Sequence, residues 1–220
     1  MTDARSQILG LVRRARGERA DAAAVDARLA ARRPNLIPAR AQLPHPEQVA
    51  LFLKMAAEAA CTVERAAADA DVPEALAAYL AAQNLPAEVR IAPSLAGLPW
   101  DRRPTLTVRP GKADPADAVS VTGAFAGVAE TGTLMMLSGP EHPTTLNFLP
   151  DTHVVVIRAS QVVGTYEDGW ARLRAGPGTM PRTVNFITGP SRTADIEMTL
   201  YMGAHGPRRL HVILVDSDPS

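Results

Sequence analysis

Two short runs in the C-terminal part of the chain contain almost no polar residues. They are HVVVI at residues 153–157 and LHVILV at residues 210–215. A strand with one face in water alternates apolar and polar side chains, whereas a strand covered on both faces needs no such alternation. Both runs have the length of a strand and are rich in β-branched residues, which favours strands over helices. The chain is therefore expected to build a sheet that is covered on both faces.

From Leu85 onward, the sequence consists of short runs of β-branched residues separated by glycine and proline. Besides the two apolar runs, strand-length runs occur at residues 88–92, 118–122, 133–137 and 183–187. The segment GTYEDGWARLRA at 164–175 predicts a short helix between two strands, and GKADPADA at 111–118 predicts an exposed loop. Strands and helices in this order indicate an α/β sheet flanked by helices.

Residues 1–84 are alanine-rich and predict helices, with breaks at 32–46 and near residues 72–73. The clearest helical segment begins after Pro46. Its apolar residues recur on one stripe, formed by Val49, Phe52, Leu53, Ala56, Ala60 and Val63. Such a stripe is expected to cover a core, whereas the charged segment at 14–33 predicts a solvated helix, a partner-binding arm or a partly disordered region. We expect a helical region at 1–84 that packs on or extends from an α/β core at 85–220.

The charge balance argues against two classes of partner. Lys plus Arg and Asp plus Glu each total 23, so the formal net charge is zero. Without net charge, no global field draws the protein onto nucleic acid or an anionic membrane. No apolar run has the length of a transmembrane helix, and the first twenty residues lack the apolar stretch of a signal peptide. We therefore expect a soluble cytoplasmic protein without membrane insertion.

The chain has one cysteine, Cys61, and five histidines. Iron–sulfur clusters and structural zinc sites need several closely spaced thiolates, so any such centre must sit on a partner protein. Cys61 lies within the alanine-rich helical pattern, which favours a buried, inert thiol. The histidines show no metal-ligand spacing apart from the weak pair His205 and His211, so no metal site is expected. Motifs of P-loop, dinucleotide-binding, zinc-protease and serine-hydrolase proteins are absent from the sequence.

The stretch ETGT at residues 130–133 is predicted to connect two strands. Gly132 permits backbone conformations and close approaches that a Cβ forbids, and Thr131 and Thr133 offer hydroxyl groups. Backbone amides in such a turn could hold an anion, whereas a plain turn explains the glycine equally well. Both interpretations stay open at this point.

Residues 189–208, GPSRTADIEMTLYMGAHGPR, form a polar segment between two apolar strands. Loops that only reverse the chain are shorter, so this length predicts a binding surface. Ser191 follows a Gly-Pro turn and is expected to cap the segment after it. Alternation then places Asp195 and Glu197 on one face of an extended segment. If that face lines a cleft, repulsion between the two carboxylates would keep one of them protonated near neutral pH, as an acid or base. The alternative is a solvated strand edge in which Asp195 caps a turn.

Four stretches occur in a fixed order between about residues 119 and 215: AETGTLMML, HVVVI, GPSRTADIE and GAHGP. Together they resemble the LUD domain family, in particular its lactate utilization protein C group. The resemblance implies a fold similar to the sugar-phosphate isomerase and CoA-transferase superfamily, a three-layer α/β sandwich. It also implies an accessory role in oxidising L-lactate to pyruvate, with two iron–sulfur proteins as partners that carry the clusters. The matching residues are Glu130, Thr131, Gly132, Gly189, Pro190, Ser191, Asp195, Ile196, Glu197, Gly203, His205, Gly206 and Pro207.

We expect the ETGT turn and the 189–208 segment to meet at the carboxyl ends of the strands, where open α/β sheets bind ligands. The pocket would hold a small anion or a nucleotide-like group, and the candidates for proton transfer are Glu197, His205, Asp195 and Glu130. The residues expected to bind the ligand are Thr131, Gly132, Thr133, Gly189, Pro190, Ser191 and Gly206. Two other functions stay open. One is a stand-alone isomerase- or acyl-transferase-like enzyme with Glu130 or Glu197 as base or nucleophile, and the other is a module that senses a carboxylate or nucleotide.

Overall fold

The computed structural model describes residues 3–15, 21–31, 33–34, 36–176, 178–193 and 201–217, apart from the side chain of Tyr201. The chain divides into two compact units, Met1–Leu36 and Ile37–Ser220. The domain boundary expected near residue 84 therefore falls inside the second unit. Residues 37–84 belong to the same compact unit as the strands.

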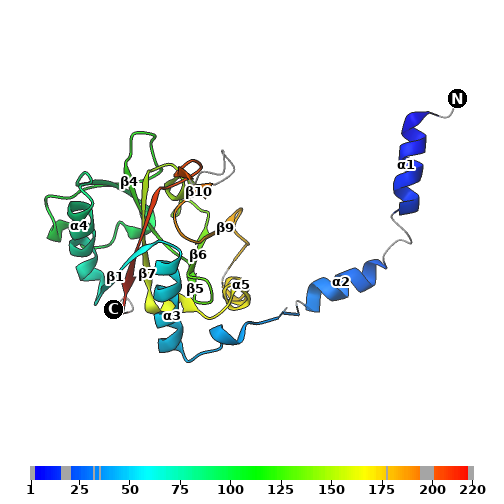
Figure 1. Ribbon diagram of the computed structural model, residues 1–220, viewed down its shortest axis with the longest axis horizontal. Coiled ribbons are helices and arrows are strands. Elements are labelled where there is room, and N and C mark those ends of the chain that lie inside the picture. The colour runs from blue at the N-terminus through cyan, green and yellow to red at the C-terminus, as the bar shows by residue number, and fades with distance from the viewer. Residues whose placement is uncertain are drawn as a thin grey trace. The chain divides into compact units, whose positions relative to one another are not determined.

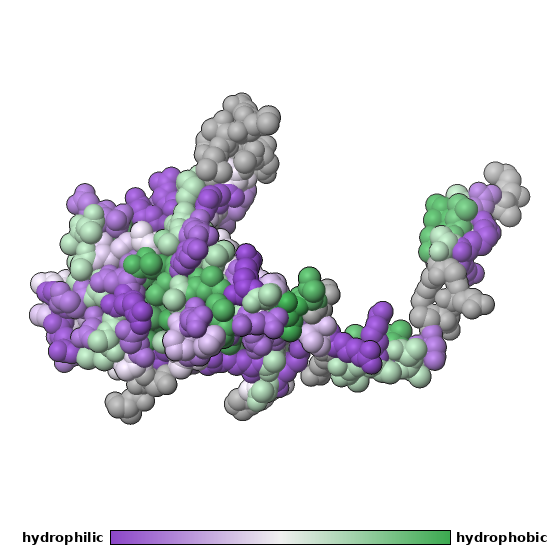
Figure 2. Space-filling model, turned by 60° about the horizontal axis from the view of Figure 1, so that its bottom comes forward, coloured by the Kyte–Doolittle hydropathy of each residue, from purple (hydrophilic) through white to green (hydrophobic). Residues whose placement is uncertain are grey.

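The first unit contains two helices, α1 (Ala4–Ala15) and α2 (Ala22–Ala31), drawn in blue in Figure 1. None of the residues in either helix is buried. Ile8 and Val12 of α1 are exposed. Figure 2 shows hydrophobic surface on this unit. Of the three interpretations of residues 14–33, the structure shows a helix with exposed side chains at α2.

The second unit is built around a six-stranded sheet. In the order in which they lie side by side, its strands are β1 (Thr62–Ala66), β12 (Arg209–Val215), β7 (Thr152–Arg158), β4 (Val119–Gly123), β2 (Glu88–Ile91) and β3 (Thr107–Pro110). Every neighbouring pair in this sheet is parallel. Parallel strands need long crossover connections, and these connections carry the other elements onto the two faces of the sheet.

The two apolar runs form β7 and β12 near the middle of the sheet, and successive residues of each strand enter different cores. Val154 and Val156 pack in a cluster with helix α4 (Val72–Ala82), whereas Val155 and Ile157 pack in a cluster with helix α3 (His45–Glu58). Side chains alternate between the faces of a strand, so the sheet is covered on both sides. This confirms the prediction from the apolar runs.

A smaller sheet and a helix complete the layer on the α3 side. The small sheet has the order β8 (Val162–Val163), β5 (Ala126–Val128), β6 (Thr133–Leu137) and β9 (Val184–Ile187). Helix α5 (Tyr166–Ala175) follows β8, and Figure 1 shows α4 on one side of the central strands and β5, β6, β9 and α5 on the other. The fold is a mixed α/β structure with a mostly parallel central sheet, as expected.

The predicted helix at 164–175 is confirmed as α5, and its start is capped on both sides. Thr165 Oγ1 accepts a hydrogen bond from the Asp168 N–H at 3.2 Å, and Asp168 Oδ2 accepts one from the Thr165 N–H at 2.9 Å. This reciprocal pair satisfies two backbone donors that the first turn of a helix leaves without partners.

The helix predicted after Pro46 ends earlier than its apolar stripe indicated. Helix α3 ends at Glu58, and Ala60 has a φ of 67°, which lies outside the helical range. The chain then enters β1, so Cys61 precedes a strand and the helical assignment of Cys61 and Val63 was wrong. β1 is an edge strand with mixed burial, and it therefore carries no continuous apolar run that would reveal it in the sequence.

Several short elements were not predicted. They are the strands β3, β8, β10 (Arg192–Thr193) and β11 (Tyr201–Met202), and the 3₁₀ helices at Ala39–Ala41, Asp69–Asp71, Pro93–Leu95, Trp100–Arg102, Thr144–Asn147 and Ala159–Gln161. Each spans two to four residues, which is too few for a hydrophobic period to show. The antiparallel pair β10 and β11 lies within the polar 189–208 segment.

Candidate functional site

The polar segment after β9 contains two turns that Ser191 holds together. Its N–H donates to the Pro207 carbonyl at 2.8 Å, and its own carbonyl accepts from the Gly203 N–H at 2.9 Å. Its Oγ accepts a hydrogen bond from the His205 N–H at 3.4 Å. The predicted capping by Ser191 concerns residues 194–200, which lie outside the described residues.

These two turns line a cavity of about 290 Å³. The residues around it are Asn147, Phe148, His153, Phe186, Ile187, Thr188, Gly189, Pro190, Ser191, His205, Gly206, Pro207 and Leu210. His153 and Leu210 are each the second residue of their strand, so the cavity lies at the amino ends of β7 and β12. We call it the amino-edge cavity. The expectation that this segment meets the carboxyl ends of the strands was wrong, because the segment runs directly into the start of β12.

His153 is the most perturbed ionisable group at the amino-edge cavity. Its side chain is fully buried, and its Nε2 lies 2.7 Å from Thr122 Oγ1. Burial lowers the pKa of His153 to about 3, so the imidazole is neutral at pH 7. Its Nδ1 has no hydrogen-bond partner among the described residues. A buried polar atom without a partner costs free energy, and a polar ligand in the cavity is one way to satisfy it.

The ETGT turn connects β5 to β6 as predicted, and it lies beside the amino-edge cavity. Thr133 Oγ1 lies 2.6 Å from Thr188 Oγ1, and Thr188 lines the cavity. Gly132 has a φ of 67°, and a Cβ at this position would clash with the backbone of Ala56 in α3. The glycine is therefore required by a close approach of the turn to the helix. Thr131, Gly132 and Thr133 stay predictions as ligand-binding residues.

Glu130 lies at the start of α5, and it is not among the residues that line the amino-edge cavity. Its side chain is 6% exposed, and its Oε1 accepts a hydrogen bond from the Tyr166 N–H at 3.0 Å. A carboxylate at this position is stabilised by the unpaired N–H groups of the first helical turn. The contacts of Glu130 thus explain its burial structurally, and its catalytic role stays a prediction.

The structure brings together five of the predicted site residues around the amino-edge cavity: Gly189, Pro190, Ser191, His205 and Gly206. His205 is exposed at this cavity. The predicted catalytic residues Asp195 and Glu197 lie outside the described residues. Sequence reasoning missed His153 as a cavity residue, because a histidine in an apolar strand resembles an ordinary core residue.

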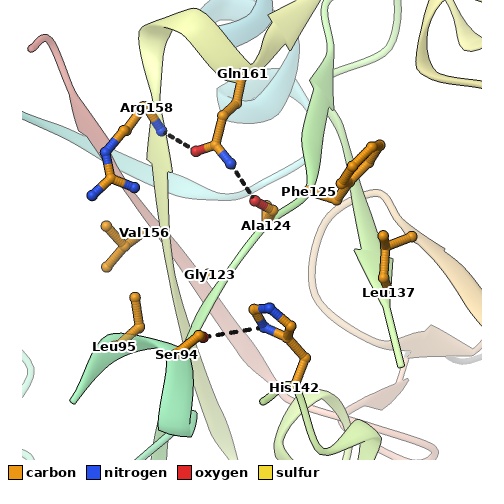
Figure 3. A pocket seen from close by; sticks show the side chains of 10 residues that line it. All are labelled: Ser94, Leu95, Gly123, Ala124, Phe125, Leu137, His142, Val156, Arg158 and Gln161. Carbon is orange, nitrogen blue, oxygen red and sulfur yellow. Dashed lines mark hydrogen bonds between the residues drawn. The ribbon is translucent and has the colours of Figure 1, made fainter. Parts of the chain in front are cut away.

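A second cavity, of about 210 Å³, lies at the opposite end of the central sheet (Figure 3). It is lined by Ser94, Leu95, Gly123, Ala124, Phe125, Leu137, His142, Val156, Arg158 and Gln161. Gly123 and Arg158 are the last residues of β4 and β7, so we call it the carboxyl-edge cavity. None of the predicted site residues lines it. Polar residues directly after predicted strands are the sequence signal that could have indicated it.

Neither a metal site nor a membrane span is found in the described part of the chain. No group of three or more His, Cys, Asp and Glu side chains there is arranged to hold a metal ion. No helix among the described residues is long and apolar enough to cross a membrane. Cys61 is buried, and burial raises the pKa of its thiol to about 11, which keeps it in the unreactive thiol form.

Part of the α/β unit is similar to a known family. Residues 112–215, a little under half of the chain, match the LUD domain. The resemblance to the LUD domain family that the sequence motifs indicated is thereby confirmed.

Individual relatives agree with this assignment. Lactate utilization protein C of Geobacillus thermodenitrificans is 38% identical over 108 residues, which cover 46% of this chain and 45% of that protein. An uncharacterized protein of Neisseria meningitidis serogroup B is 40% identical over 97 residues, which cover 44% of this chain and 42% of that protein. The aligned segments therefore span less than half of the length of these relatives.

The fold also matches an experimental structure. A crystal structure of a DUF162 family protein from Deinococcus radiodurans is similar with a TM-score of 0.59 at 26% sequence identity. The match covers 79% of this chain and 99% of that one. The similarity thus extends well beyond the segments aligned with the two relatives above.

Proposed function

We propose that the protein acts in lactate utilization, as a cytoplasmic accessory subunit that binds a small hydroxy or oxo acid in the amino-edge cavity. One observation carries the proposal. The turns that line this cavity, Gly189–Ser191 and His205–Pro207, lie within the segment 112–215 that matches the LUD domain. Relatives that match this chain include proteins called lactate utilization protein C.

The chemistry of lactate oxidation divides naturally between this chain and its partners. Converting L-lactate to pyruvate removes two electrons and two protons. With one cysteine the chain cannot hold an iron–sulfur cluster by itself, so in this proposal the electrons leave through two iron–sulfur partner proteins. This chain would hold the substrate carboxylate through backbone N–H groups and Ser191. His205 would accept one of the two protons, and the other would be released to water.

Affinity purification tests the proposed assembly. The tagged full-length chain is isolated from its own cells grown on L-lactate, and the eluate is assayed for iron, sulfide and lactate-dependent dye reduction. Co-elution of iron, sulfide and activity is the expected result. An iron-free chain without activity from lactate-grown cells would overturn the proposed complex.

Substitutions then test the cavity within that complex. We expect His205→Gln to reduce lactate-dependent dye reduction by about 10²-fold, the usual loss when a general base is removed. His45→Gln is the matched control, because His45 is an exposed histidine that does not line the cavity. Equal activity of the two variants would remove His205 from the proposed chemistry. Glu197→Gln and Asp195→Asn, assayed in the same way, test the two predicted carboxylates.

A binding module without turnover is the second candidate, and the unpartnered Nδ1 of His153 favours it. A ligand that binds only the folded chain raises its stability, by about 2.7 kcal/mol at a concentration of 100 Kd. Two results together would support this candidate. Lactate or pyruvate stabilises the isolated chain, and the assembled complex shows no activity. Stabilisation together with partner-dependent activity supports the accessory subunit.

A further inference from the structure

The carboxyl-edge cavity lies where the order of the parallel strands changes direction. From β2 the chain passes to β3 at one edge of the sheet, and it then returns to β4 on the other side of β2. The following strands β7 and β12 continue away from β3. In open α/β sheets, ligands bind outside the carboxyl ends of the strands at such a change of direction. The cavity has this position, because Ser94 follows β2 and Gly123 ends β4.

One side of this cavity carries a neutral hydrogen-bonding pair. Ser94 Oγ lies 3.2 Å from His142 Nδ1 (Figure 3). Burial lowers the pKa of His142, while the charge of Glu141 acts in the opposite direction, so the imidazole is neutral at pH 7. A neutral imidazole and a hydroxyl can each donate or accept a hydrogen bond, which suits an oxygen substituent of a ligand.

Arg158 supplies the charged group of the same cavity. Its Nη2 binds both carboxylate oxygens of Asp69, at 3.0 and 2.8 Å. Its Nε is buried and has no hydrogen-bond partner among the described residues. Gln161 fixes this end of β7, because its Oε1 accepts from the Arg158 N–H at 2.8 Å and its Nε2 donates to the Ala124 carbonyl at 2.7 Å. The start of the Arg158 side chain is therefore held in place, and the side chain, which is 23% exposed, lines the cavity.

The remaining walls and the charge balance narrow the class of ligand. Leu95, Phe125, Leu137 and Val156 form apolar walls. Arg158 is the one charged side chain among the ten lining residues, and Asp69 neutralises much of its charge. Such a site offers too little positive charge for a phosphate dianion, and it suits a single carboxylate with a short apolar part.

We propose that the carboxyl-edge cavity is a second binding site, for a small monocarboxylic acid that carries an oxygen substituent. The carboxylate accepts a hydrogen bond from the Arg158 guanidinium, the oxygen substituent bonds to Ser94 and His142, and the short alkyl part lies on the apolar walls. This site is separate from the amino-edge cavity. His153 and Arg158 are five residues apart on β7, which corresponds to about 16 Å at the rise of a strand.

Titration of the full-length chain with 2-oxobutyrate, followed by NMR of the histidine side chains, tests the proposal. The His142 signals, assigned with His142→Asn, are expected to shift on addition of the acid. Ser94→Ala and Gly123→Ala are expected to weaken this response by about tenfold, the effect of losing one hydrogen bond or of filling the cavity. Ser191→Ala, in the amino-edge cavity, is the matched control and is expected to leave the His142 response unchanged.

Three results would overturn the second site. They are the absence of a His142 response to 2-oxobutyrate, a weakening by Ser191→Ala as large as that by Ser94→Ala, and tighter binding of inorganic phosphate than of 2-oxobutyrate. Thermal unfolding of each variant shows whether it is folded, and Gly123→Ala provides a second variant if Ser94→Ala is not. The proposed role in lactate utilization is tested separately by partner co-elution, so either proposal can fail alone.

Discussion

The two cavities lie at opposite ends of the same buried strand, β7, and they are built in different ways. The amino-edge cavity is shaped by backbone, since Gly189 has a φ of 79° and a Cβ there would clash with the Ala59 carbonyl. The carboxyl-edge cavity is shaped by side-chain bonds of Ser94, Arg158 and Gln161. A backbone-built cavity requires glycine and proline at fixed neighbouring positions, and it therefore leaves a contiguous motif. A side-chain-built cavity is lined by residues from distant parts of the chain, and it therefore produces no contiguous motif in the sequence.

The largest expected effect is on stability, and it comes from adding a methyl group to one glycine at each cavity. Gly189→Ala should lower the free energy of unfolding by about 3 kcal/mol, because the new Cβ meets the Ala59 carbonyl and the residue keeps a positive φ. Gly123→Ala, at the carboxyl-edge cavity, should change it by less than about 1 kcal/mol, since its nearest neighbour would be Leu95 Cδ2 at an ordinary 3.7 Å. Urea unfolding measures both values. Similar losses for the two variants would show that the two cavities do not differ in their need for glycine.

The next largest effect is a dependence of the free energy of unfolding on pH, and it arises at the amino-edge cavity. The folded-state pKa of His153, about 3, lies below the unfolded value of about 6.5, so the unfolded chain binds the extra proton between these values. The contribution of His153 should therefore be constant above pH 7, and on acidification it should lower the free energy of unfolding by about 2 kcal/mol between pH 8 and pH 5. His153→Gln should reduce this slope, whereas the exposed His45→Gln should not.

His211 also affects how the free energy of unfolding depends on pH. Burial lowers its pKa to about 4, and the backbone of Thr62 raises it in part, so His211 also disfavours the acidified folded state. His153→Gln should therefore flatten the acid slope without abolishing it. A slope identical to that of the unsubstituted chain would show that His153 is not held neutral, and the unfolding midpoints at pH 8, 6 and 5 decide this.

A smaller effect concerns the charge balance of the carboxyl-edge cavity. Asp69→Asn removes the carboxylate that Arg158 binds, and the expected loss of stability is about 1 kcal/mol, because both side chains are partly exposed. The freed guanidinium should also shift binding toward more highly charged anions. Calorimetric titration with inorganic phosphate checks this, with Asp26→Asn on the exposed surface of α2 as control. Unchanged phosphate binding would mean that Asp69 does not set the preference of this cavity.

The smallest expected effect comes from removing the first unit. Both cavities are lined by residues of the second unit, and none of the residues in α1 and α2 is buried. A chain starting at Ile37 should therefore unfold within about 2 °C of the full-length chain, a change that corresponds to less than 1 kcal/mol. A large drop in Tm would show that the helices of the first unit contribute to the stability of the α/β unit.

Part of the site could be read from the sequence. The turns at Gly189–Ser191 and His205–Gly206, which the sequence singled out, line one cavity, because glycine, proline and serine in a long polar segment mark a turn-built surface. The position of that pocket was wrongly predicted, since the edge of the sheet that a segment reaches depends on the strand it enters next. Glu130 was selected for its acidity, whereas its carboxylate lies at the start of α5. This position of Glu130 could not be predicted from the sequence, because it depends on a contact with α5.

The sequence alone indicated the class of fold, because short apolar runs rich in β-branched residues, such as 153–157 and 210–215, favour strands covered on both faces. It also indicated the resemblance to the LUD domain family, through motifs that require glycine at close backbone approaches. Only the tertiary structure decided that α3 ends before Cys61, that His153 is left with an unpartnered nitrogen, and that Ser94, His142 and Arg158 share a cavity. These features depend on contacts between residues far apart in the chain, and local patterns of hydrophobicity carry no information about such contacts.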